Sequence, residues 1–144
     1  MKIIIEDIAD DAEEEIIIRT HGLDDDVLQL IARMKQEKNM LTCIDEQENI
    51  LPLKQNDVYY FDAVDGRVYV YLEKSVLEIK KRLYEIEELC DSYIRISKAQ
   101  IVNAKMIERL SPMFNGRLEA HLKNGEKVII SRQYVPDLKK YFGV

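Results

Sequence analysis

Two Asn-Gly pairs near the carboxyl end constrain the fold of this chain more than any other feature. Asn115-Gly116 and Asn124-Gly125 bracket residues 117–123, along which polar and apolar side chains alternate. Asn-Gly accepts the positive φ angles of a tight hairpin turn, and strict alternation is typical of a strand with one buried face. The sequence therefore predicts an antiparallel hairpin, which residues 127–131 close with Val128 and Ile130 facing inward.

The residues before this hairpin predict further strands. Four segments are rich in β-branched and aromatic residues, namely 40–44, 50–53, 57–64 and 67–72. Asp65-Gly66 lies between the last two segments and is another hairpin signal. Pro52 lacks an amide hydrogen, so its strand is expected at a sheet edge. Cross-strand packing, rather than base stacking, is the favoured interpretation for four tyrosines, Tyr59, Tyr60, Tyr69 and Tyr71.

The other elements of this region are mixed. Residues 76–79 fit a strand that leads into a helix at about 80–90, and residues 93–102 alternate as an extended segment. Residues 103–110 fit either a short helical turn or an extended link. Residues 134–142 predict a terminal helix that begins near Pro136 and ends at Gly143. The expected fold class is therefore mainly β, or α+β overall.

The first forty residues predict a separate β-β-α unit. Residues 2–8 and 15–20 are rich in isoleucine, whose stiff branched side chain favours strands, and a turn across residues 9–13 would join them as a hairpin. Residues 23–38 carry one apolar stripe at helical spacing, with Asp24 as the N-cap. We expect two domains, 1–42 and 43–144.

Charge is distributed unevenly along the chain. The net charge of the whole is −6, but residues 1–48 carry 5 Lys or Arg against 14 Asp or Glu, whereas residues 92–144 carry 10 against 4. Such asymmetry indicates an electrostatic role for one part. The basic carboxyl-terminal part is suited to a polyanion.

Several functional classes find no support in the residues. Cys43 and Cys90 are far apart in apolar surroundings, and His21 and His121 are isolated, so neither a metal site nor a catalytic centre is indicated. We expect no enzyme activity and no cofactor. No apolar run approaches the ~20 residues of a membrane span, and the amino terminus does not fit a signal peptide. A cytoplasmic location is therefore expected.

Three blocks of sequence resemble the LytTR family of bacterial DNA-binding domains. The first runs from Tyr93 to Asn103 (YIRISKAQIVN), the second is Phe114-Asn115-Gly116-Arg117, and the third runs from Lys123 to Tyr134 (KNGEKVIISRQY). The resemblance covers about residues 48–144. It implies small β-sheets with short flanking helices, in which loops rather than a recognition helix enter the grooves of double-stranded DNA.

The resemblance also implies which residues contact DNA. Five positions match the base-contacting loops, namely Arg67, Ser97, Lys98, Arg132 and Gln133. Histidine is common in the family where Ser97 stands, and arginine where Lys98 stands, which bears on the sequence preferred. Five further positions are candidates for the DNA backbone, namely Lys105, Asn115, Arg117, Lys123 and Lys127.

These residues predict a sequence-specific transcriptional regulator that acts as a homodimer. The alternative is a non-enzymatic module that binds RNA or protein on the same fold. Many family members carry a phosphorylated receiver domain, which forty residues cannot hold. We expect the acidic unit 1–42 to serve dimerisation or docking of a protein partner, or to weaken non-specific DNA binding through repulsion.

Overall fold

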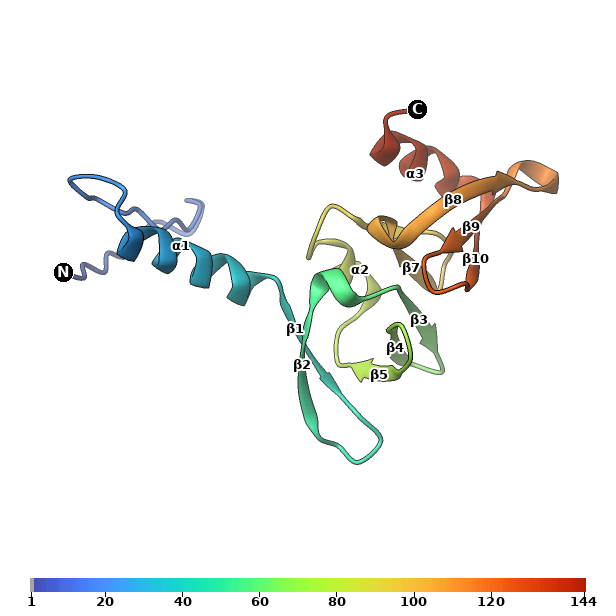
Figure 1. Ribbon diagram of the computed structural model, residues 1–144, viewed down its shortest axis with the longest axis horizontal. Helices are drawn as coiled ribbons and strands as arrows, with labels where there is room; N and C mark the ends of the chain where they lie inside the picture. Colours follow the sequence, from blue (N-terminus) through green and yellow to red (C-terminus); the bar gives the residue numbers. More distant parts are fainter. Residues whose placement is uncertain (1) are drawn as a thin grey trace. The chain divides into compact units, whose positions relative to one another are not determined.

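The chain divides into two units, Met1–Lys35 and Gln36–Val144, and each is described here by itself (Figure 1). This computed structural model describes residues 2–144, apart from the side chains of residues 35–38. Among these residues, no helix is long and apolar enough to cross a membrane.

The helix α1, Asp25–Lys38, begins as the sequence predicts. The amide of Val27 donates a hydrogen bond of 2.9 Å to Oδ1 of Asp24, which is the expected N-cap. Asp25 and Asp26 occupy the first turn, where carboxylates interact favourably with the helix dipole. Val27 is the buried apolar residue of this turn.

The predicted amino-terminal hairpin is wrong, because the structure has no strand in residues 2–24. A turn does form, since the amide of Ala12 donates to the carbonyl of Ala9 at 3.0 Å. Strands extended from this turn would pair residues whose numbers add to 21. Glu6 would then face Glu15, and Lys2 would face Arg19. Like charges directly opposite each other destabilise a strand pair, so the turn exists without its ladder.

The second unit contains an antiparallel sheet of seven strands (Figure 1). Its order is β2-β1-β5-β4-β3-β7-β6, so β2 with Pro52 lies at an edge as expected. The β3–β4 turn has positive φ angles at Asp65 and Gly66. The strands are β1 Met40–Ile44, β2 Ile50–Lys54, β3 Tyr60–Val64, β4 Arg67–Tyr71, β5 Val76–Ile79, β6 Tyr93–Arg95 and β7 Gln100–Asn103.

Residues 93–102 differ from the extended segment that their alternation predicts. They form two strands, β6 and β7, which are joined by a tight loop at residues 96–99. The amide of Ile96 donates to the carbonyl of Gln100 at 3.0 Å and closes this loop. The sequence has no glycine there, so the turn lacks the signal that marks the other hairpins.

A second antiparallel sheet contains the predicted hairpin. It comprises β8 Ile107–Pro112, β9 Leu118–Leu122 and β10 Lys127–Ile130, in the order β10-β9-β8. Asn115 and Gly116 have φ angles of 64° and 74° in the β8–β9 turn. As predicted, Val128 and Ile130 are buried. Residues 103–110 include both expected alternatives, a 3₁₀ turn at Ala104–Met106 and then β8.

Two short helices complete the unit. α2, Leu83–Glu87, lies within the segment predicted as helical, and α3, Val135–Phe142, follows the 3₁₀ turn Arg132–Tyr134. Pro136 is in the first turn of α3, and Gly143 ends the helix with a φ angle of 75°. One apolar core lies against the seven-stranded sheet around Phe61, and another joins the second sheet to α3 through Ile130 and Leu138.

The aromatic hairpin packs across its strands. Tyr60 and Tyr71 are directly opposite each other in β3 and β4, and their rings stack with centroids 4.2 Å apart. Asn103 is fully buried nearby and donates to the carbonyl of Val58 at 2.8 Å. Packing therefore accounts for this tyrosine pair, as the sequence interpretation favoured.

Candidate nucleic-acid interface

The loop between β6 and β7 presents Lys98 to solvent. The amide of Ala99 donates to the hydroxyl oxygen of Ser97 at 3.2 Å, so the Ser97 side chain holds the loop in its bend. Lys98 at the tip is exposed, while Ile96 just before the loop is fully buried. A buried residue therefore anchors the loop that carries this exposed cation.

The segment after β10 lies beside this loop. The amide of Ser131, just after β10, donates to the carbonyl of Ile96 at 2.8 Å. This hydrogen bond joins the end of β10 to the start of the β6–β7 loop. The chain then forms the 3₁₀ turn Arg132–Tyr134, whose end is held by a 2.9 Å bond from the Tyr134 amide to the Ser131 carbonyl. Backbone hydrogen bonds thus bring together two segments about thirty residues apart.

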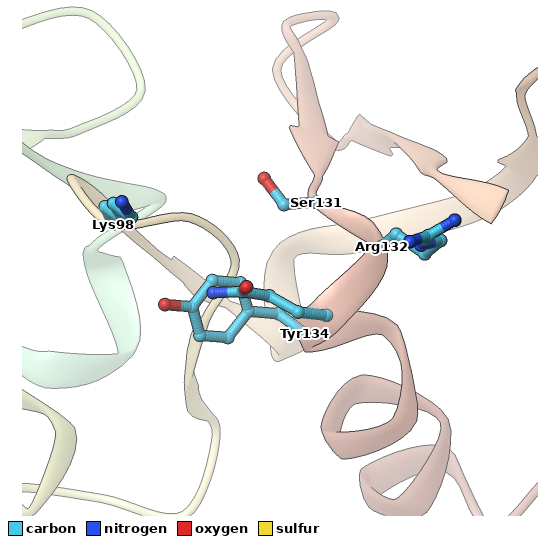
Figure 2. A pocket seen from close by; sticks show the side chains of 5 residues that line it. Lys98, Ser131, Arg132 and Tyr134 are labelled. Atoms are coloured by element: carbon cyan, nitrogen blue, oxygen red, sulfur yellow. The ribbon is translucent and has the colours of Figure 1, made fainter. Parts of the chain in front are cut away.

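These segments line an open depression of about 390 Å³. Figure 2 shows Lys98 on one side, Arg132 on the other, and the ring of Tyr134 between them. Ser131 and Gln133 complete the lining. The depression therefore contains three residues that the sequence predicted as base contacts, Lys98, Arg132 and Gln133, and Ser97 lies next to it in the same loop.

The turn 114–116 lies against the other side of Arg132. A Cβ atom placed on Gly116 would lie 2.9 Å from Cδ and 3.0 Å from Cγ of Arg132, so the aliphatic stem of Arg132 rests on the backbone of this glycine. Phe114 in the same turn is 88% exposed. Arg117 folds back, and its Nε donates to the carbonyl of Phe114 at 3.4 Å. The β8–β9 turn and the β10–α3 turn consequently form a continuous surface.

Comparison with known proteins agrees with the three motif blocks. The LytTR family model, described as the LytTr DNA-binding domain, matches residues 48–143. The chain belongs to the LytTR family. A solved LytTr DNA-binding domain from Bacillus cereus superimposes with a TM-score of 0.68 at 29% identity, covering 74% of this chain and 98% of that domain.

Relatives of this LytTR chain extend the similarity beyond the matched domain. HTH-type transcriptional regulators of Staphylococcus aureus, from strains NCTC 8325 and COL, are each 29% identical over 140 residues, which cover 94% of both chains. A third, from strain MRSA252, is 28% identical over the same length. The match thus includes most of the segment that precedes residue 48.

Other predicted residues of the LytTR domain lie outside the depression. Arg67 is in the β3–β4 turn, with its guanidinium 3.7 Å from the carboxylate of Glu78. That carboxylate also lies 2.8 Å from Lys80, whose hydrogen bond lowers the pKa of Glu78. Lys105 donates to Oδ1 of Asn56 at 3.4 Å. Lys123 and Lys127 are exposed around the β9–β10 turn.

Sequence reasoning missed several residues that shape the site. Ser131 and Tyr134 line the depression, Gly116 supports Arg132, and Phe114 is exposed beside it. All four fall inside the motif blocks, so their proximity to the predicted contacts was visible in the sequence. Their roles depend on two long-range contacts, from Ser131 to Ile96 and from Gly116 to Arg132, which no local pattern encodes.

Proposed function

We propose that this LytTR protein is a sequence-specific transcriptional regulator that reads the major groove of double-stranded DNA through loops. The observation that carries this proposal is the position of Lys98, Arg132 and Gln133 around one open depression. Lys98 and Arg132 form no ion pair with any residue that the structure describes. Their charges are therefore available for an anionic or electron-rich partner.

Different side chains suit base contacts and phosphate contacts. The guanidinium of Arg132 can donate two parallel hydrogen bonds to O6 and N7 of guanine, while the Lys98 ammonium acts as a point donor. Arg67, Ser97 and Gln133 complete the proposed base contacts. The proposed phosphate contacts, which supply affinity and register, are Lys105, Asn115, Arg117, Lys123 and Lys127.

Loops suit this role better than a helix. α2 spans five residues and α3 eight, and five strands separate them in the sequence. Within residues 36–144 no two helices are joined by the short turn of a helix-turn-helix motif. α3 also packs Leu138 into the core. The turns before α3 and between the strands are therefore the proposed reading elements.

The full regulator is proposed to work as a cytoplasmic homodimer without enzymatic activity. Two copies would double the number of loops that contact a long site, as two-fold symmetric regulators do on paired half-sites. The acidic residues of the first unit would also oppose DNA bound without sequence preference. At concentrations where both chains are monomeric, a chain that lacks residues 1–35 should then bind random DNA more tightly at low salt than the full chain.

Selection from random DNA duplexes tests the proposal. We expect the wild-type chain to enrich one motif, with a log–log salt slope of about −0.9 per phosphate contacted. Lys98→Ala with Arg132→Ala should remove the sequence preference. Lys139→Ala with Lys140→Ala is the matched control, because both lysines are exposed on α3 and the same charge is removed.

Two results would overturn the proposal. One is the absence of any enriched motif. The other is an equal loss of preference in the α3 control, which would mean that net charge rather than the depression determines binding. An RNA duplex of the enriched sequence should compete weakly, because the deep and narrow major groove of A-form RNA excludes side chains.

A further inference from the structure

The first unit exposes an unusual amount of apolar surface. Six isoleucines are 51% to 89% exposed, namely Ile3, Ile4, Ile5, Ile8, Ile16 and Ile17. Burial of one such side chain removes on the order of 100 Å² from water. Together they supply at most roughly 600 Å², a large part of the ~800 Å² that each partner contributes to a standard protein interface. A patch of this size indicates a surface that another chain covers.

The charges that flank the isoleucines indicate that the chain covering them is a second copy of this protein. Each run has three isoleucines between opposite charges, Lys2 to Glu6 in the first run and Glu15 to Arg19 in the second. The turn at residues 9–12 opposes like charges when the two runs of one chain pair as a hairpin. The hairpin is absent from the structure, in keeping with this repulsion.

Pairing with a second copy reverses this relation. If residues 15–19 pair antiparallel with the same residues of another chain, centred on Ile17, Glu15 of each copy faces Arg19 of the other. A parallel pair between residues 2–6 and the second run is also complementary, with Lys2 beside Glu15 and Glu6 beside Arg19. Parallel strands of one chain need a connection of about a dozen residues or more, and residues 7–14 supply eight.

We propose that residues 2–20 are a dimerisation element that becomes β-structure only when it pairs with a second copy of this chain. Residues 15–19 form the central antiparallel pair about the two-fold axis, and residues 2–6 of each copy add in parallel to the second run of the other. The interface is isologous, as in most symmetric dimers. The isoleucines supply its affinity and the flanking charges fix its register.

Sedimentation of the full chain over a range of concentrations provides the test. We expect the wild type to dimerise, and Glu15→Arg or Arg19→Glu alone to raise the dissociation constant at least roughly tenfold, because each change turns four attractive pairs of the dimer, two central and two outer, into repulsive ones. An equimolar mixture of the two variants should dimerise more tightly than either variant alone, since both central pairs and half of the outer pairs are then complementary. The double variant Glu15→Arg with Arg19→Glu should be restored only in part, because its central pairs are complementary again while Lys2 and Glu6 of the outer strands then face like charges. Asp11→Arg, in the exposed turn, is the control for the change of charge.

Circular dichroism supplies a second readout, because β-structure should increase with concentration in step with dimerisation. A wild type that stays monomeric at high concentration would overturn the proposal. So would a mixture that dimerises no better than its components, or a Glu15→Arg variant that matches the Asp11→Arg control. The inference rests on the homodimer proposed above, which a monomeric wild type would overturn as well. DNA binding is not part of these measurements, so the proposed reading of DNA through loops is tested separately.

Discussion

Replacing Gly116 with alanine should damage DNA recognition more than it damages folding. Gly116 has a φ angle of 74°, a left-handed conformation that costs an alanine roughly 1 kcal/mol. The new Cβ would also meet Cδ of Arg132 at 2.9 Å, which is too close for any real contact. Arg132 must then move from the position in which its stem rests on the turn.

The two effects can be separated by a matched variant. Gly143 has nearly the same φ angle, 75°, but nothing lies within 4 Å of a Cβ placed there. Gly143→Ala should therefore cost about the same stability and leave Arg132 in place. A displaced Arg132 loses part or all of a bidentate base contact, which is worth about 1–3 kcal/mol of discrimination. That corresponds to a roughly fivefold to 150-fold weaker preference for the selected site.

Fluorescence anisotropy measures this on the selected duplex and on duplexes with one base pair changed, while thermal unfolding reports stability. We expect both alanine variants to lose similar stability, and Gly116→Ala alone to lose discrimination at one base pair. Equal discrimination in the two variants would refute the reasoning, because it would mean that the position of Arg132 does not depend on the turn. In a chain that already carries Arg132→Ala, adding Gly116→Ala should cause no further loss of discrimination, because the side chain that the turn positions is then absent.

Two further predictions follow from exposure and burial. Phe114→Ala should weaken DNA binding in the anisotropy titration, because its 88% exposed ring can contact thymine methyl groups or insert between base steps. It should not lower stability, because the ring contributes little to the core. Tyr84→Ala, at an exposed site on α2, is the control and should leave the titration unchanged. Burial raises the pKa of the Cys43 thiol from 9.0 to about 11. Between these pH values the unfolded chain releases a proton that the folded chain keeps, so the free energy of unfolding should fall as the pH rises from 9 to 11. Cys43→Ala should make this fall smaller in urea unfolding without abolishing it, because burial also raises the pKa of tyrosines such as Tyr60 and Tyr93.

The strongly marked turns of the sequence were sufficient to predict most of the second unit. Asp65-Gly66 and Asn124-Gly125 stand where the hairpins turn, because Gly66 and Gly125 take the positive φ angles that other residues avoid. Pro52 lies on an edge strand because it cannot donate a ladder hydrogen bond. The turn at residues 96–99 has no such residue. Its bend depends on the hydrogen bond that the Ser97 hydroxyl oxygen accepts from the Ala99 amide, and on the pairing of β6 with β7.

The amino-terminal unit shows the limit of propensity. Isoleucine favours strands in any window, but a strand also needs a partner in a compatible register. The turn at residues 9–12 dictates a register in which the flanking charges repel. The strand propensity of the isoleucines therefore predicts a hairpin that this register does not allow. Local sequence patterns also do not predict that Lys98 and Arg132 lie around one depression, because their proximity depends on the hydrogen bond between Ile96 and Ser131.

That hydrogen bond joins two main-chain groups, so the distance between the two loops is independent of which side chains they carry. Substitutions at positions 98, 132 and 133 can change the chemistry of the surface without moving the backbone that holds them, whereas Ser97 also stabilises the bend of its loop. A lineage could thus acquire a new operator through a few point mutations, each nearly neutral for folding. Regulators copied by gene duplication could diverge in target in this way while every copy stayed foldable throughout.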